Sequence, residues 1–298
     1  MPSARTVDIP VGDLTFDVLI SGPDGGIPLV ALHGFPESAA SWGKVTPLLV
    51  AAGYRVIAPN QRGYSAVARP EGVDAYRIEC LVADVVGLLD ALGVPAAHLV
   101  GHDWGSAVAW QVAGRHPSRV RSLTAISVPH PTAFGWALRE DDDQRQRSAY
   151  MGLLRQEGKA EKVLSEDDFR RLRAMFGGRI APEFVDEHLR VLGGAGALTG
   201  ALNWYRAMTS DFGNIGPTTV PTTYVWSTDD TALGRAGAER CGEFVDAPYE
   251  FVVLEGGSHW IPEERPEELA GAILAGGGGG GRRPGGGGGP GWGLKNPP

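Results

Sequence analysis

The stretch "LVGHDWGSAVAW", residues 99–110, decides the predicted fold. Two apolar residues lead into Gly101, Asp103 stands at the centre of the next five residues, and small residues follow Gly105. Glycines two positions before and after a central residue permit a turn from strand to helix that is too tight for larger side chains. We therefore expect the carboxyl group of Asp103 to project above the edge of a sheet, beside the first N–H groups of a helix.

Strand-like and helix-like segments alternate on both sides of this turn. Residues 75–94 carry apolar side chains at helical spacing, and Gly93 follows as a predicted C-terminal cap. The N-terminus predicts two short strands around Gly12 and Asp13. Short apolar runs predict further strands at 27–34, 54–63, 96–103, 121–129, 220–227 and 249–257. This order predicts the α/β class, with a mostly parallel sheet covered by helices on both faces.

Composition narrows the classes of function. The chain has 298 residues, of which 43% are hydrophobic, and its formal net charge is −8. No Lys/Arg cluster precedes the C-terminal tail, which argues against nucleic acids and anionic membranes as partners. No run reaches ~18 apolar residues and no apolar signal segment begins the chain. With only Cys80 and Cys241, a disulfide framework is not expected. We predict a cytoplasmic protein, monomeric or homodimeric, whose partner is a small molecule.

The pattern changes twice along the chain. Residues 130–217 show little strand character, and their charged run at 139–147 predicts a solvated helix face or loop. We predict a core made of 1–129 and 218–275, with 130–217 inserted as a helical cap. The residues 276–298 form a low-complexity Gly/Pro tail that cannot bury a core.

A carboxylate at a tight turn predicts covalent catalysis followed by hydrolysis. Asp103 is ionised at neutral pH without help from a base, attacks carbon and leaves an ester. Water must then cleave that ester, which requires a base. His259 comes just after the strand at 249–257, and Asp229 and Asp230 come just after the strand at 220–227. The chain order nucleophile, acid, histidine is typical of the α/β-hydrolase fold.

Hydrolysis of an ester also needs donors for the oxyanion. The backbone N–H groups of Phe35, in the loop after the strand at 27–34, and of Trp104 are the candidates. We expect His33 and His102 to be structural.

Five motifs together resemble the epoxide hydrolases of the α/β-hydrolase superfamily: "HGFPES..SW", "NQRGYS", "GHDWG", "NWYRA" and "GGSHW". The resemblance runs from about residue 5 to residue 270 and fails in the tail. It implies that two cap tyrosines hold the epoxide oxygen; "NWYR" places one at Tyr205, and "SAYMGLLRQEGKAE" places the other at Tyr150. The register Trp-Gly-x-x-Asp of the family favours Asp230 over Asp229, although Ser227 and Thr228 depart from it.

The resemblance implies hydrolysis of an epoxide to a vicinal diol, without a metal or an organic cofactor, in a mostly apolar pocket. Trp104, Trp136 and Trp204 are candidate pocket walls. The nearest alternative is a haloalkane or haloacid dehalogenase with the same three catalytic residues, but Phe35 offers no side-chain donor to a halide. A ligand-binding protein without activity is a further alternative. A serine esterase is disfavoured because no serine occupies the centre of the turn.

Overall fold

The structure, a computed structural model, describes residues 4–213 and 215–277. Its centre is an eight-stranded sheet with the order β1-β2-β4-β3-β5-β6-β7-β8. The strands are β1 (Arg5–Val11), β2 (Leu14–Ser21), β3 (Ile27–Leu32), β4 (Tyr54–Pro59), β5 (Ala97–His102), β6 (Val120–Ile126), β7 (Thr222–Ser227) and β8 (Tyr249–Leu254). Strands β1 and β2 form an antiparallel hairpin, and β2 pairs antiparallel with β4. From β4 onward in the sheet order, through β3 and β5 to β8, every pair of neighbouring strands is parallel. The predicted mostly parallel sheet and the N-terminal hairpin are both confirmed.

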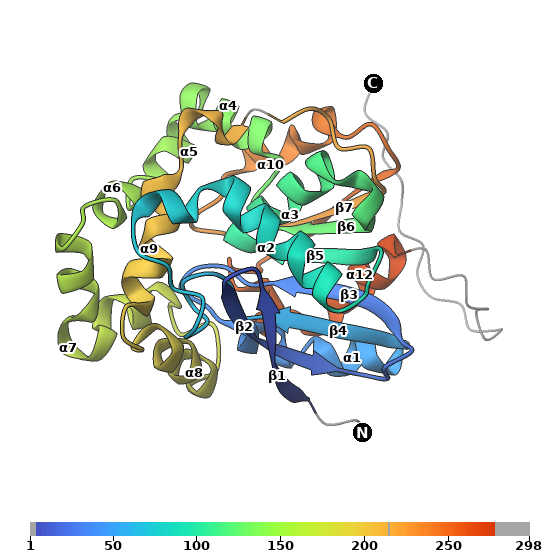
Figure 1. Cartoon of the computed structure of the whole chain (residues 1–298). Coiled ribbons are helices and arrows are strands. Elements are labelled where there is room, and N and C mark those ends of the chain that lie inside the picture. Colours follow the sequence, from blue (N-terminus) through green and yellow to red (C-terminus); the bar gives the residue numbers. More distant parts are fainter. Residues whose placement is uncertain (1–3, 214, 278–298) are drawn as a thin grey trace.

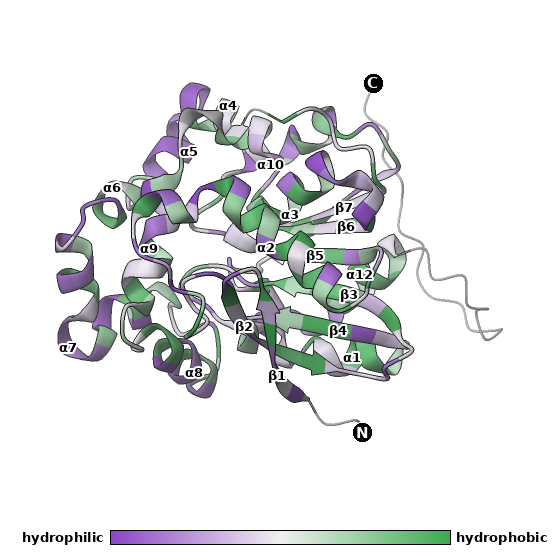
Figure 2. Ribbon diagram, in the orientation of Figure 1, coloured by the Kyte–Doolittle hydropathy of each residue, from purple (hydrophilic) through white to green (hydrophobic). Residues whose placement is uncertain are grey.

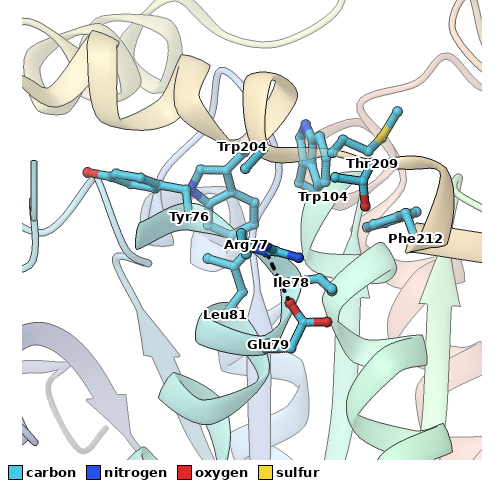
Figure 3. Close-up of a pocket in the computed structure, with 11 residues that line it drawn as sticks. Tyr76, Arg77, Ile78, Glu79, Leu81, Trp104, Trp204, Thr209 and Phe212 are labelled. Atoms are coloured by element: carbon cyan, nitrogen blue, oxygen red, sulfur yellow. Dashed lines mark ion pairs between the residues drawn. The ribbon is translucent and has the colours of Figure 1, made fainter. Parts of the chain in front are cut away.

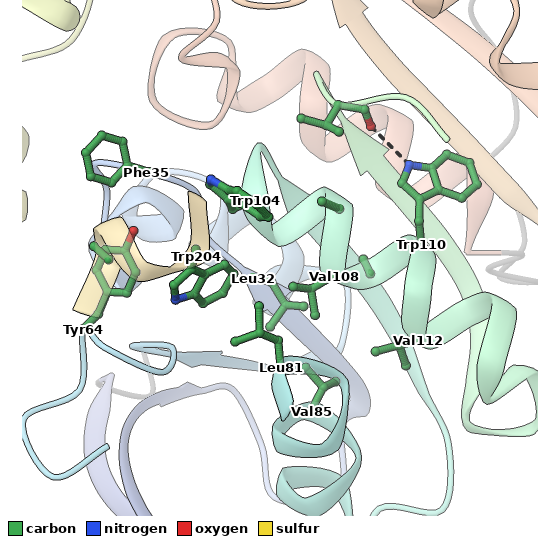
Figure 4. Close-up of a cluster of buried hydrophobic side chains, with 14 of the residues drawn as sticks. Leu32, Phe35, Tyr64, Leu81, Val85, Trp104, Val108, Trp110, Val112 and Trp204 are labelled. Carbon is green, nitrogen blue, oxygen red and sulfur yellow. Dashed lines mark hydrogen bonds between the residues drawn. The ribbon is translucent and has the colours of Figure 1, made fainter. Parts of the chain in front are cut away.

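Alternating side chains along the strands divide the core into two layers. In β3, Leu29 and Ala31 pack with α1 (Thr46–Ala51) and α12 (Pro266–Gly276). The intervening Val30 and Leu32 belong to the other layer, under α2 (Ile78–Ala91) and α3 (Trp104–Arg115). Period-two burial on both faces explains why these strands are apolar almost throughout, as their colouring in Figure 2 shows. Figure 4 shows α2 and α3 contributing Leu81, Val85, Val108 and Val112 to the second layer.

Helix α2 is shorter than the sequence pattern indicates. It begins at Ile78 rather than near residue 75 because Arg77 has extended backbone angles, and Val73–Tyr76 form a separate 3₁₀ turn. The predicted cap at Gly93 is confirmed, since its φ of 63° is in the left-handed region that glycine favours. Four more 3₁₀ turns connect the elements: Ala39–Gly43, Pro117–Arg119, Ser210–Gly213 and Cys241–Phe244.

The chain between β6 and β7 is helical in the described residues. It contains α4 (Pro131–Glu140), α5 (Asp142–Arg147), α6 (Met151–Leu154), α7 (Lys159–Met175), α8 (Pro182–Leu192) and α9 (Ala197–Ala207). We call these six helices the helical segment. Figure 1 shows them on the side of the molecule toward which the arrow of β4 points. They therefore lie over the carboxyl ends of the parallel strands, where loops of α/β folds carry functional groups.

The charged run at 139–147 is only partly solvated. Helix α5 does expose most of it, but Gln144 is buried and bonds the loop after β7 through Ala232 O and Gly234 N. The run thus has the expected solvated helix face, and Gln144 lies on the opposite side of this helix, which packs against the core.

Two short helices, α10 (Arg235–Glu239) and α11 (Ile261–Glu264), follow β7 and β8. Across the described ranges, no helix combines the length and the apolar composition that a bilayer crossing requires. The predicted Gly/Pro tail lies, from residue 278 onward, outside the described residues.

Candidate active site

Asp103 occupies a strained turn between β5 and α3. Its φ of 52° and ψ of −118° are unusual for a residue with a side chain. The turn closes only because its flanking positions lack side chains: a Cβ at Gly101 would overlap the carbonyl oxygen of Gly105, and a Cβ at Gly105 would overlap that of Leu32. The backbone N–H of Asp103 bonds Ile126 O at 3.2 Å. The sequence thus holds the carboxyl group at a fixed place above the sheet.

The two carboxylate oxygens of Asp103 face different partners. Oδ1 accepts a hydrogen bond of 2.8 Å from the backbone N–H of Phe35. Oδ2 lies 3.6 Å from Nε2 of His259. The N–H of Trp104 is the first of α3 and has no acceptor within the helix. One oxygen is therefore held by the backbone donor of Phe35, and the other accepts no hydrogen bond from a backbone group of the described residues.

His259 is held by the acid that follows β7. Its Nδ1 lies 2.9 Å from Oδ2 of Asp230, whose Oδ1 accepts bonds from the backbone N–H groups of Ala232 and Leu233. The adjacent Asp229 points elsewhere and lies 3.7 Å from Arg179. The structure thus brings Asp230, and not Asp229, to the histidine.

This arrangement controls the charges of both groups. Burial disfavours the ionised form of Asp230, but the charge of His259 and the bonds from it and from the loop N–H groups outweigh burial and lower the pKa of Asp230. Burial likewise disfavours the cation of His259, but Asp230 and Asp103 outweigh burial and raise its pKa well above the ordinary value. With both carboxylates ionised, the imidazole is therefore stabilised as a cation.

Two phenols approach Asp103 from the helical segment. Tyr205 lies in α9 and is buried, with its ring centroid 5.1 Å from Trp104 and 5.4 Å from Phe35. Tyr150 precedes α6, and its ring centroid lies 6.4 Å from that of Tyr205. Tyr150 keeps 36% of its surface exposed, but its hydroxyl end is enclosed. Burial, reinforced by the charge of Asp103, raises the pKa of both phenols, so both remain protonated donors.

A cavity of about 40 Å³ joins Asp103 to the two phenols. Most of its wall is apolar, and it is lined by Asp103, Trp104, Ala107, Val128, Phe134, Ser148, Tyr150, Met151, Tyr205, Met208, Phe212, Ala232 and Leu233. Phe134, Met208 and Phe212 also line a groove of about 520 Å³ between α4 and the chain after α9. The cavity at Asp103 therefore adjoins a larger space through these three side chains.

Of the three tryptophans expected as pocket walls, only Trp104 borders this cavity. Trp136 does not, because it lies two residues after Phe134, about 200° around helix α4. Its ring instead packs under the guanidinium of Arg240 at 4.1 Å. Trp204 packs against Trp104, with ring centroids 5.6 Å apart, and lines a separate cavity of about 50 Å³ (Figure 3). The expectations for Trp136 and Trp204 are therefore wrong for the cavity at Asp103.

Sequence reasoning missed a buried group of charged residues beneath this site. His102, expected to be structural, contacts Glu37 and the carbonyl oxygen of His259, and Glu37 lies near Glu263 and His188. Glu37 and His102 stood in motifs that the sequence analysis used, but neither motif indicates a contact between them. Glu263 and His188 come from helices far apart in the chain, so no local pattern pairs them.

Comparisons with known proteins agree with this geometry. Residues 27–266 match the family described as "alpha/beta hydrolase fold". The chain is 34% identical to Epoxide hydrolase A of Mycobacterium tuberculosis (strain ATCC 25618 / H37Rv), covering 92% of this chain and 96% of that protein. It is also 35% identical to the AB hydrolase superfamily protein YfhM of Bacillus subtilis (strain 168), covering 88% and 93% of the two chains.

Solved structures show the same similarity. One, described as a novel epoxide hydrolase from metagenomes of hot environments, superposes with a TM-score of 0.83 at 30% identity, covering 93% of this chain and 99% of that one. Epoxide Hydrolase A from Mycobacterium thermoresistibile gives a TM-score of 0.79 at 32% identity, covering 93% and 98%. The similarity thus spans the sheet, the turn at Asp103 and the helical segment.

Proposed function

The chain belongs to the epoxide hydrolases of the α/β-hydrolase superfamily, and from this premise we propose how its residues convert an epoxide to a vicinal diol. The observation that carries the proposal is the position of Asp103. One of its oxygens bonds a backbone N–H at 2.8 Å, and its carboxyl group lines the same cavity as two protonated phenols. That cavity supplies a nucleophile on one side of a small molecule and acids on the other.

In the first step, Oδ2 of Asp103 attacks an epoxide carbon. The bond between that carbon and the ring oxygen breaks, and its electron pair goes to the oxygen. Tyr150 and Tyr205 hydrogen-bond this oxygen, and one of them transfers its proton to it, since an alkoxide is otherwise a poor leaving group. The product is a hydroxyalkyl ester of Asp103.

In the second step, His259 removes a proton from water, and the water oxygen bonds the carbonyl carbon of the ester. Oδ1, now the carbonyl oxygen, takes the negative charge beside the N–H groups of Phe35 and Trp104. Asp230 holds the imidazolium that forms. Collapse of the intermediate breaks the bond to the alkyl oxygen, which takes the proton of His259, and the diol leaves. Asp103 is left as a carboxylic acid, and transfer of its proton restores the phenol that was deprotonated in the first step.

The alternative of a dehalogenase is not favoured. The donors across the cavity are phenols, which suit a developing alkoxide, and Phe35 contributes no side-chain donor to a halide. The relatives described above also carry the name epoxide hydrolase. A diol assay run beside a halide-release assay separates the two activities.

We further propose a small apolar epoxide as the substrate, because most of the cavity wall is apolar. Residues 130–217, which contain the helical segment, would act as the cap that carries the two phenols over the core of 1–129 and 218–275. A cytoplasmic location is also proposed, and it agrees with the free thiols of Cys80 and Cys241.

The test is a single turnover in ¹⁸O-labelled water with enzyme in excess. Label should enter the carboxylate of Asp103 and not the diol, because water attacks the ester carbonyl. Label in the diol alone would mean direct attack of water on the epoxide and would exclude the ester. His259→Gln provides the second measurement: it should accumulate the alkyl-enzyme, detected as an added mass of one substrate.

A further inference from the structure

Beneath the site, two carboxyl groups and two histidines form a buried cluster that reaches from α8 to the carbonyl group of His259. The cluster consists of Glu37, His102, His188 and Glu263, each at most 1% exposed. Glu37 follows the loop of Phe35, and His102 immediately precedes Asp103. His188 lies in α8 and Glu263 in α11. The charges of these four groups follow from their hydrogen bonds.

Both ring nitrogens of His102 face acceptors. Nδ1 lies 2.8 Å from Oε2 of Glu37, and Nε2 lies 2.8 Å from the carbonyl oxygen of His259. Oε2 of Glu37 also accepts a bond of 3.0 Å from the backbone N–H of Gly34, and despite burial the pKa of Glu37, lowered to about 2 chiefly by His102, leaves this oxygen ionised and unable to donate. A carbonyl oxygen cannot donate. His102 must therefore carry a proton on each nitrogen and is a cation.

The other two histidines near the cluster differ from His102. His33 accepts at Nε2 from the backbone N–H of Gln61 and bonds Gly34 O through Nδ1, so it is neutral. His188 has a hydroxyl, Ser38 Oγ, at 2.9 Å on one side and Glu263 Oε1 at 3.1 Å on the other, so one nitrogen can accept. Burial lowers the pKa of His33 and of His188 to about 4, in agreement with neutral rings.

The two carboxyl groups each leave one oxygen without a partner. Oε1 of Glu37 and Oε2 of Glu263 are buried and accept no hydrogen bond from the described residues. Burial, the charge of Glu37 and a bond to it raise the pKa of Glu263 well above the ordinary value. Although burial opposes its ionisation, Glu37 has a pKa lowered to about 2, chiefly by His102. A proton on Oε2 of Glu263 that is donated to Oε1 of Glu37 satisfies both orphaned oxygens and leaves one negative charge, on Glu37.

We propose that Glu37 and the neutral acid Glu263 hold His102 as a permanent cation that positions His259 and keeps it able to act as a base. The N–H of His102 fixes the carbonyl group of His259, and the ring centroids of the two histidines are 4.9 Å apart. A second positive charge at that distance disfavours protonation of His259. This role rests on the proposed function, in which His259 must be neutral when water attacks the ester.

Other charged and titratable groups face this cluster, and none reproduces the effect. Lys44 bonds the backbone oxygen of Glu263, His33 is neutral, and Tyr64 is a buried phenol with a raised pKa. Asp103 and Asp230 contact His259 rather than the two glutamates. Arg147 bonds the backbone oxygen of Asp230 and not the imidazole of His259. Among the described residues, His102 is therefore the positive charge whose ring lies against that of His259.

Three isosteric variants test the inference. Glu263→Gln keeps a donor toward Glu37 and leaves the anion in place, so the acid limb of the pH profile for ester hydrolysis should keep its position. In Glu37→Gln, the negative charge passes to Glu263, which does not bond His102 directly. The acid limb should therefore move part of the way to higher pH. The double variant removes the anion, so His102 becomes neutral. Loss of the cation alone at 4.9 Å would raise the limb by roughly 0.6 to 2.5 pH units, and the simultaneous loss of the paired anion makes the expected rise smaller than this.

Glu264→Gln is the matched control. It makes the same substitution in the same helix, but its carboxyl group bonds Ser258 and Arg179 instead of the cluster. Its acid limb should not move. A double variant with the wild-type limb, or a Glu263→Gln limb that moves as far as that of the double variant, would overturn the proposal.

A second measurement does not depend on activity. In protein labelled with ¹⁵N-histidine, both nitrogens of His102 should give protonated signals at pH 7.5 in the wild type, assigned by their loss in His102→Asn. A neutral ring in the wild type would refute the cation even if the enzyme forms diol normally. If instead His102 is a cation and no diol forms, the proposed function fails and the charge assignment stands.

Discussion

Replacing Tyr205 by Phe should slow the opening of the epoxide without slowing hydrolysis of the ester. The substitution removes one oxygen and keeps the ring that packs 5.1 Å from Trp104 and 5.4 Å from Phe35. The hydroxyl ends of both tyrosines are enclosed, and Tyr205 is the more buried residue, 3% exposed against 36% for Tyr150. Removing one preorganised donor to a developing oxyanion typically costs about 10²–10³ in rate. We therefore expect a loss of that size in the alkylation rate for Tyr205→Phe, and a smaller loss for Tyr150→Phe.

Fluorescence of Trp104, which borders the cavity, should report each step in a stopped-flow experiment. The first phase should slow in Tyr205→Phe, and the rate of decay of the alkyl-enzyme should match that of the wild type, because the phenol does not contact the attacking water. Tyr54→Phe is the control: it also removes a buried phenol oxygen, but in the layer under α1 and α12. An alkylation rate within a factor of three of the wild type, or a defect confined to ester decay, would refute the assignment of Tyr205 as a donor to the epoxide oxygen.

Three further predictions concern the scaffold. Gly105→Ala should prevent folding or lower the melting temperature strongly, because its Cβ overlaps a carbonyl oxygen of β3, whereas Gly152→Ala, with open space around it, should not. Glu263→Gln should raise stability at pH 7.5 but not at pH 4. In the wild type, the native state keeps a proton on Glu263 that the unfolded carboxyl group loses above its ordinary pKa, so the wild type loses stability as the pH rises above that value. Thermal melts of both proteins at both pH values check this. Phe134→Ala should increase kcat/KM for bulkier epoxides by opening the cavity toward the groove, while Trp136→Phe should leave the substrate profile unchanged, as a panel of epoxides of graded size would show.

The turn at Asp103 was predictable because its physical cause is local. Glycines at 101 and 105 are required by contacts within a few residues of Asp103, and alternation of strands and helices predicts the sheet around it. The same is true of the acid and the histidine, which follow strands β7 and β8 and so meet at one edge of a parallel sheet. Chain order alone did not separate Asp229 from Asp230; the register of the family favoured Asp230, and the structure places it at His259.

The remaining errors and omissions arise where the cause is not local. The phase of helix α4 turns Trp136 away from the cavity, and the sequence gives that phase only when it is known which side α4 packs against. Gln144 belongs to a charged run, yet its amide bridges to the loop after β7. The cluster around His102 likewise joins four elements from distant parts of the chain. Such contacts depend on tertiary packing, which periodicity does not encode.

The charges around His259 also explain how one imidazole can serve both steps. In the free enzyme it faces two carboxylates, and they favour its cation, which lies 3.6 Å from the nucleophile as an ion pair and is no base. Formation of the ester removes the charge of Asp103, so the pKa of His259 must fall at the moment when a base is needed. Asp230 remains to hold the ring, and His102 beneath it opposes protonation. The reaction itself thus converts His259 into a base, and a histidine whose pKa did not fall between the free enzyme and the trapped ester would contradict this account.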